Sequence, residues 1–263
     1  MSLITHRLYK PARSKELHRG LFSYLTESVL NMVNFIKLNG DVDIKYYHDL
    51  FNIPGYGNEN LYDICLSQDE NDYKINNNLY VNIESFENIL NLDCYDIERY
   101  SEDVKLISEK VINKFFIPNT SLNNLINERH RQINFNTTIG VHRRSTDIRL
   151  HHKVIDIRDI FNQIESNEFE SVFLMCDNIY DTNKFKGRYG NKLITYDEFT
   201  SEDKNLPFFK INNSVEDIHN HVKELLFGVF TLSKTKNFIC TKSNISSFCI
   251  LSNSKLNYKL LNK

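Results

Sequence analysis

T-I-G-V-H-R-R-S-T-D, from Thr138 to Asp147, is where this sequence changes abruptly from apolar to polar. Ile139 to Val141 form a short apolar run, which is typical of a buried parallel strand. The polar side chains begin where such a strand would end. Open α/β sheets bind their ligands at the carboxyl ends of the strands. The sequence therefore predicts an α/β fold with a ligand site directly after this strand.

The polar half of this stretch contains groups suited to an anion. Two guanidinium groups, an imidazole and a carboxylate lie within six residues: His142, Arg143, Arg144, Thr146 and Asp147. Arginine presents its N–H donors in a fixed fork that matches phosphate oxygens, and Asp147 can hold one fork while the other faces the ligand. The alternative is a surface ion-pair cluster after an edge strand. Composition alone leaves both interpretations open.

A second strand end carries another polar group. Ser171 to Met175 is a buried-strand pattern, and Asp177 follows it after Cys176. A carboxylate beyond a parallel strand is well placed to accept hydrogen bonds from a ribose or a base. An aspartate that caps the next helix is an equally economical interpretation.

The third polar cluster lies near the C-terminus. Asp217 to Ser252 reads as a helix, a strand over Asn237 to Cys240, a serine-rich turn and a second helix. The hydroxyl side chains of this turn are Thr241, Ser243, Ser246 and Ser247. Hydroxyls and backbone N–H groups beside a helix N-terminus can bind a pyrophosphate. Without further information, a serine N-cap is the simpler interpretation.

The first half of the chain predicts a glycine turn and several helices. Gly20 precedes apolar residues at helical spacing from Leu21 to Ile36, so it either binds an anion at a helix N-terminus or begins a helix packed on a sheet. Two more helical patterns follow, over Val104–Phe116 and Leu122–Ile133, with a break at Pro118. We place a domain boundary near residue 130, which divides the chain into residues 1–130 and 131–263.

Composition narrows the class of protein. The chain has 263 residues and a net charge of −2, so no global field attracts nucleic acid or a membrane surface. No window approaches the ~18 apolar residues of a spanning helix, and the N-terminus lacks a signal-peptide pattern. Five cysteines without CxxC spacing predict reduced thiols and a soluble cytoplasmic protein.

The three clusters together resemble the GDP-fucose-dependent fucosyltransferases, a superfamily with α-1,6-, α-1,2- and protein O-fucosyltransferase branches. The central stretch resembles its HxRRTD-type motif: His142 and Arg144 match the His and first Arg, Thr146 and Asp147 match the Thr-Asp, and Ser145 replaces the second Arg. FLMCDN around Asp177 resembles the family's LATDD-like strand end. LSKTKNFICTKSNISS resembles its LSxxxxFxCTxSS segment.

This resemblance implies a GT-B fold, with two Rossmann-like domains facing a cleft and the donor mostly on the C-terminal one. It implies a donor site formed by Gly20, His142, Arg143, Arg144, Asp177, Thr241, Ser243, Ser246 and Ser247. Arg144 would contact the β-phosphate of GDP-fucose, and the base would fall on or near His152, since an imidazole is chemically suited to accept a proton near neutral pH. The alternative is that His151 and His152 are simply polar residues on a loop. The catalytic set is then Arg144, His152 and Asp147, without a metal or a cofactor other than the donor substrate.

The implied reaction is an inverting transfer of L-fucose from GDP-β-L-fucose to a hydroxyl of a glycan acceptor. One departure concerns the donor: the family's acidic residue in the penultimate helix falls on Gly228, with Glu224 one turn earlier. Two alternatives therefore stay open. One is a GT-B transferase that uses another nucleotide sugar, and the other is a non-catalytic protein of this fold that binds nucleotide sugars, glycans or a partner.

Overall fold

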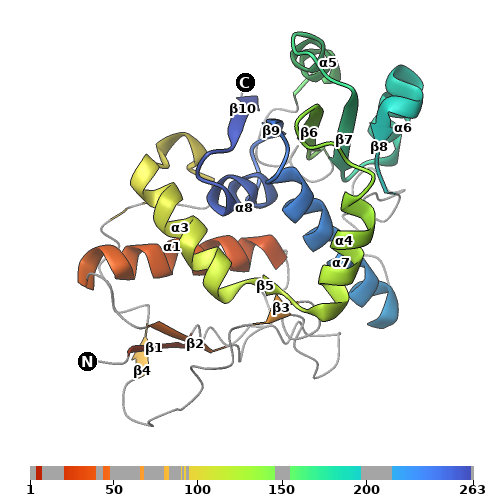
Figure 1. Ribbon diagram of the computed structural model, residues 1–263. Coiled ribbons are helices and arrows are strands. Elements are labelled where there is room, and N and C mark those ends of the chain that lie inside the picture. The colour runs from red at the N-terminus through yellow and green to blue at the C-terminus, as the bar shows by residue number, and fades with distance from the viewer. Residues whose placement is uncertain are drawn as a thin grey trace.

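The computed structural model describes residues 4–7, 21–39, 44–47, 66–67, 80–82, 90, 92, 95–145, 155–196 and 215–261. Its main feature is a five-stranded parallel sheet in the order β10-β9-β6-β7-β8 (Figure 1). The strands are β6 (Thr138–Arg143), β7 (Ser171–Cys176), β8 (Leu193–Ile194), β9 (Asn237–Thr241) and β10 (Asn257–Leu261). This sheet confirms the α/β class and the three strands that the sequence predicts.

β6 is the central strand, and every one of its residues is buried. Val141 lies opposite Leu174 on β7 and Ile239 on β9. A strand with neighbours on both sides and helices on both faces has no solvent-facing side, which explains why its sequence does not alternate between apolar and polar residues.

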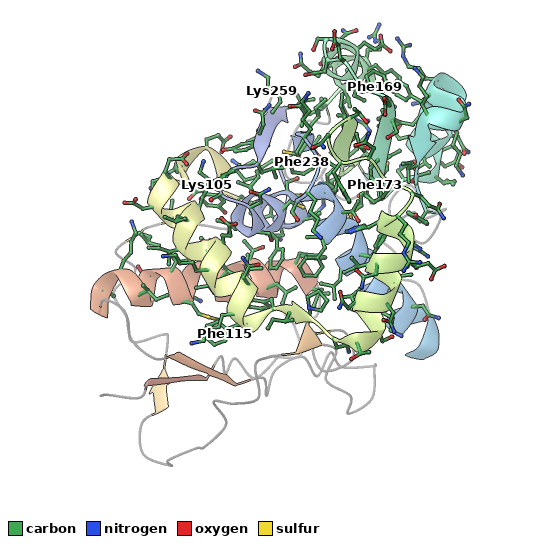
Figure 2. The ribbon with its side chains drawn as sticks, in the orientation of Figure 1. Lys105, Phe115, Phe169, Phe173, Phe238 and Lys259 are labelled. Atoms are coloured by element: carbon green, nitrogen blue, oxygen red, sulfur yellow. The ribbon has the colours of Figure 1, made fainter. Side chains whose placement is uncertain are left out.

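Two helices cover one face of this sheet, α5 (Ile157–Glu165) and α6 (Ile179–Tyr189). They pack with Ile139, Val141 and Leu174, which are alternate residues of their strands. The opposite face meets α7 (Val215–Leu232) and α8 (Asn244–Ser252). Phe173 and Phe238 are buried in the core on that side (Figure 2).

The first half of the chain packs directly onto this second layer. Its helices are α1 (Leu21–Asn39), α3 (Glu102–Phe115) and α4 (Thr120–His130), with a short 3-10 turn η3 (Ile97–Arg99) before α3. α1 and α3 contact α8, and α4 contacts α7. Phe248 of α8 meets the rings of Phe22 and Phe116 at centroid distances of 5.5 and 6.1 Å. One continuous hydrophobic core therefore joins the two halves.

A smaller parallel sheet belongs to the N-terminal half. It has the order β2-β1-β4, formed by β2 (Ile44–Tyr47), β1 (Ile4–Arg7) and β4 (Tyr80–Asn82). Figure 1 shows it at the opposite end of the molecule from the large sheet, with α1 and α8 between them. Three short elements complete the fold: β3 (Leu66–Ser67), β5 (Ile117–Pro118) and η5 (Gly190–Lys192). The division at residue 130 and the cleft between two domains remain predictions.

Side-chain caps fix where the helices begin. Ser101, Asn119 and Asp156 accept hydrogen bonds from the first backbone N–H groups of α3, α4 and α5. Such caps satisfy donors that have no partner within the helix. No helix in the described part of the chain is both long and apolar enough to cross a membrane. Three cysteines among the described residues, Cys176, Cys240 and Cys249, are buried and free.

Gly140 allows β6 to approach the end of α7 closely. A Cβ atom at this position would lie 2.5 Å from Thr235 Oγ1 and 3.0 Å from Leu232 Cδ2. We expect Gly140→Ala to lower the free energy of unfolding by about 1–3 kcal/mol, because the added methyl forces a shift in a packed core. Urea titration followed by circular dichroism measures this change.

Gly187 provides the matched control. It lies within α6, and a Cβ atom there would have nothing within 4 Å. Gly187→Ala should therefore leave stability unchanged or raise it by about 0.5–1 kcal/mol through helix propensity. If both alanine variants unfold at the wild-type urea concentration, the close approach at Gly140 is not a tight contact.

Candidate functional site

The carboxyl edge of the large sheet brings the three sequence clusters together. β6 ends at Arg143, with β7 and its following Asp177 on one side and β9 with the β9–α8 turn on the other. This arrangement follows from the strand order, because β6 pairs in parallel with both β7 and β9. The edge is thus the place where the fold offers a ligand site.

Arg144 stands between the two neighbouring strands. Its backbone N–H donates to Thr241 Oγ1 at 3.0 Å, and the next N–H, that of Ser145, donates to Asp177 Oδ1 at 2.8 Å. Arg144 is partly exposed, whereas Arg143 and Ser145 are buried. Among the described residues of the central motif, Arg144 is therefore the guanidinium nearest to solvent at this edge.

Arg143 points into the protein. Its Nε donates to Asp181 Oδ2 at 2.7 Å, its Nη1 donates to the Ile155 carbonyl at 3.0 Å, and its side chain is 5% exposed. The sequence suggests Asp147 as the carboxylate that holds one arginine fork, and Asp147 lies outside the described residues. Within them, Asp181 of α6 is the acid that pairs with Arg143. A donor contact from Arg143 stays a prediction, and it would require this guanidinium to leave its buried partner.

His142 and the serines of the β9–α8 turn form one buried hydrogen-bonded network. His142 Nδ1 lies 2.9 Å from Ser246 Oγ and 3.1 Å from Ser243 Oγ. Ser243 is the N-cap of α8 and accepts from the Ser246 N–H, while the Ser246 hydroxyl donates to the Thr241 carbonyl. Ser247 Oγ donates to the Ser243 carbonyl at 3.1 Å.

Through these hydrogen bonds the serines hold the β9–α8 turn in its conformation. Ser246 and Ser247 are fully buried, and Ser243 is 1% exposed. The simpler interpretation of Ser243, an N-cap, is confirmed. The first backbone N–H groups of an α-helix have no acceptor within the helix, and in α8 the Ser243 hydroxyl satisfies that of Ser246. Direct donor contacts of these hydroxyls remain predictions.

Asp177 is not the cap of the following helix. Asn178 has that role, since its Oδ1 accepts from the N–H groups of Tyr180 and Asp181. Asp177 is partly exposed and accepts instead from the Ser145 N–H and hydroxyl. Its carboxylate thus lies beside the central motif, as an acceptor at the sheet edge, and a contact with a ribose or base remains a prediction.

Glu224 has a protein partner on α4. Arg129 binds both of its carboxylate oxygens, through Nη2 at 2.8 Å and through Nη1. The guanidinium also lies over the rings of Tyr196 and Phe227, at 4.1 and 4.9 Å from their centroids. Glu224 lies one turn before Gly228, where the family has an acidic residue. If Glu224 took over that residue's role, its carboxylate would have to do so while it is bound to Arg129 in the α4–α7 interface.

The N-terminal half reaches the same turn. Asn244 Nδ2 donates to Tyr95 Oη at 3.3 Å, and Lys242 pairs with Glu98 at 3.6 Å. The sequence offered no signal for these contacts, because nothing in the pattern around Tyr95 indicates chemistry. Several residues of the predicted site and its motif lie outside the described residues: Gly20, Thr146, Asp147 and His152. No cluster of three metal-ligating side chains occurs in the part of the chain that is described.

His142 should make stability depend on pH. Burial and then the Arg144 charge lower the pKa of His142 to about 3. The unfolded chain takes up a proton near pH 6.5 and the folded protein only near pH 3, so stability falls as the pH drops between these values. We expect the free energy of unfolding to be about 2 kcal/mol lower at about pH 5 than at about pH 7 from this residue alone.

Urea titrations at both pH values measure this difference. His142→Asn removes the titrating group, so its stability should change less with pH than that of the wild type. His130, whose pKa is lowered to about 4 by burial and by Lys234, contributes in the same direction and remains in the variant. An unchanged pH slope in His142→Asn would contradict the assignment of a neutral, buried imidazole.

Comparison with solved structures reveals the fold. The structure of NodZ alpha-1,6-fucosyltransferase soaked with GDP-fucose superposes with a TM-score of 0.54 at 12% identity, covering 95% of this chain and 92% of that one. NodZ from Bradyrhizobium gives a TM-score of 0.52 at 11% identity, over 95% and 91%. A mutant of Arabidopsis thaliana FUT1 in complex with GDP gives 0.50 at 10% identity, over 98% and 69%.

Sequence comparison does not add to this result. No protein-family model matches the chain, and no curated protein matches it. The structural likeness extends over nearly the whole chain and nearly the whole of NodZ, so it concerns the complete arrangement of elements and not one sheet alone. The chain has the fold of these fucosyltransferases.

Proposed function

We propose that this protein is a glycosyltransferase that moves L-fucose from GDP-β-L-fucose to a hydroxyl of a glycan acceptor. The observation that carries the proposal is the placement of Arg144, partly exposed between β7 and β9 at the ligand-binding edge of a chain with this fold. The resemblance of the central motif to HxRRTD, with His142 and Arg144 in matching positions, supports the same assignment.

The donor diphosphate is proposed to lie between Arg144 and the N-terminus of α8. The guanidinium offers a bidentate fork to phosphate oxygens, and the helix offers N–H groups and the positive end of its dipole. His142 is neutral at physiological pH, because burial lowers its pKa to about 3. His142 therefore adds no positive charge at this edge, and it holds the turn through Ser243 and Ser246.

The proposed reaction is a displacement with inversion. The acceptor oxygen forms a bond to the anomeric carbon of fucose, the bond from that carbon to the β-phosphate oxygen breaks, and GDP leaves with the bonding electrons. Arg144 would stabilise the charge that develops on the leaving diphosphate. The acceptor proton passes to a general base, for which the resemblance indicates His152. Neither a metal nor a cofactor other than the donor is part of this proposal.

The acceptor is proposed to approach from the N-terminal half. Tyr95 and Glu98 of that half already contact Asn244 and Lys242 in the β9–α8 turn. A sugar bound on this side would lie close to the donor edge.

Calorimetric titration of the purified protein tests the donor class. GDP, GDP-fucose, GDP-mannose and UDP-glucose are compared, each with and without Mg²⁺. Binding of the guanine nucleotides alone, unchanged by Mg²⁺, is the expected result. If UDP-glucose binds instead, the protein is a transferase for another nucleotide sugar. If none of the four binds, the donor site is absent and the proposed activity is wrong.

A further inference from the structure

Three elements hold the backbone of residues 143–145 at the sheet edge. Thr241 of β9 accepts from the Arg144 N–H on one side, and Asp177 after β7 accepts from the Ser145 N–H on the other. The third element is α6, which binds the side chain of Arg143. Because Arg144 lies between these attachments, its direction depends on all three.

The attachment to α6 is a buried ion pair whose charges are satisfied. Arg143 Nε donates to Asp181 Oδ2 at 2.7 Å, and the two side chains are 5% and 11% exposed. Asp181 Oδ1 accepts from Lys184 at 3.2 Å. Arg143 Nη1 also donates to the Ile155 carbonyl at 3.0 Å. The guanidinium therefore binds α6 and the segment just before α5 at the same time.

Stability alone does not account for a charged residue at this position. Ile139, Val141 and Arg143 are alternate residues of β6, and the first two pack in the apolar core beneath α5 and α6. Replacing a buried ion pair by apolar side chains often leaves a protein equally stable or more stable. An apolar residue at position 143 would supply packing, but no directional bonds to Asp181 and Ile155.

We propose that Arg143 and Asp181 are positioning residues, which act through Arg144. Their ion pair fixes the end of β6 against α6, so that the neighbouring guanidinium faces the donor diphosphate in one orientation. This inference rests on the proposed function for its catalytic consequence. Its structural part, the fixing of residues 143–145, does not depend on that function.

Hydrogen exchange tests the structural part. The N–H groups of Arg144 and Ser145 are hydrogen-bonded, so they should exchange slowly in the wild type. In Arg143→Met, and in the milder Asp181→Asn, we expect their exchange to accelerate at least about tenfold, while the N–H groups of β9 keep their protection. Unchanged exchange at 144 and 145 in both variants would overturn the inference.

Kinetics test the catalytic part. In Arg143→Met and Asp181→Asn, kcat with GDP-fucose should fall about 10- to 100-fold, with KM for the donor within about threefold, since misorientation removes transition-state stabilisation. In a protein that already carries Arg144→Ala, the further change Arg143→Met should lower kcat by less than about twofold. If Arg143→Met lowered kcat in the Arg144→Ala variant by the same factor as in the wild type, Arg143 would not act through Arg144.

The matched control is another Arg–Asp pair. Arg158 and Asp156 lie 2.7 Å apart, but the arginine side chain is 82% exposed. Arg158→Met should keep wild-type kcat and wild-type exchange at residues 144 and 145. If the wild type neither binds GDP nor turns over GDP-fucose, the proposed function fails, and the exchange result still decides the inference about the ion pair.

Discussion

Arg144→Ala should lower kcat for fucosyl transfer by about 10²–10³-fold, which corresponds to about 2.7–4 kcal/mol of transition-state stabilisation. The charge on the departing diphosphate is largest in the transition state, and Arg144 is the partly exposed guanidinium that the described part of the central motif places at the sheet edge. Steady-state kinetics with GDP-fucose and an accepted glycan measure the loss. Calorimetry with GDP should show weaker binding as well.

Two variants give this prediction its controls. Arg144→Lys keeps the charge but loses the bidentate fork, so its kcat should lie between those of the wild type and the alanine variant. Arg131→Ala removes an exposed arginine just after α4 and should leave kcat unchanged. Full activity in Arg144→Ala would rule out the central motif as the phosphate site.

Glu224→Ala should lower the free energy of unfolding by about 1–3 kcal/mol, because it leaves the partly buried charge of Arg129 in the interface without its carboxylate. Arg129 is held by Glu224 and lies over the rings of Tyr196 and Phe227. Stacking on two rings cannot replace a bidentate carboxylate, and the Arg129 side chain is only 21% exposed. Urea denaturation followed by circular dichroism provides the measurement.

Glu128→Ala is the matched control, since it removes an exposed carboxylate next to Arg129 on the same helix. It should change stability by less than about 0.5 kcal/mol. The double variant Arg129→Met with Glu224→Leu should recover most of the lost stability, because no unpaired charge is left. A loss below about 1 kcal/mol in Glu224→Ala would show that this pair behaves like an exposed surface ion pair.

Local patterns predicted the backbone of the site well. The apolar run before His142 is β6, the run before Asp177 is β7, and the segment before Thr241 is β9. These predictions succeed because strand and helix periodicity are properties of neighbouring residues. Parallel strands between helices then place their carboxyl ends together, so the sequence also indicated which polar residues would meet.

Assignments of individual side chains were less successful. Residue type alone does not distinguish Asn178 from Asp177 as the cap of α6, since asparagine and aspartate both cap helices. Adjacent residues of one motif also have different surroundings: Arg143 is buried against Asp181, while Arg144 is partly exposed. The motif letters do not distinguish these two arginines, because the burial of each depends on what packs above the strand end.

The α/β class, the three strands and the polar residues that follow them can be derived from the amino-acid sequence. The partner of each charged or polar side chain becomes known only when the helices and strands are packed together. Arg143 meets Asp181 across 38 residues, Arg129 meets Glu224 across 95, and His142 meets Ser246 across 104. Secondary structure follows from residues within a few positions of each other. Pairing over such distances depends on how helices and strands pack, and chain order alone does not specify it.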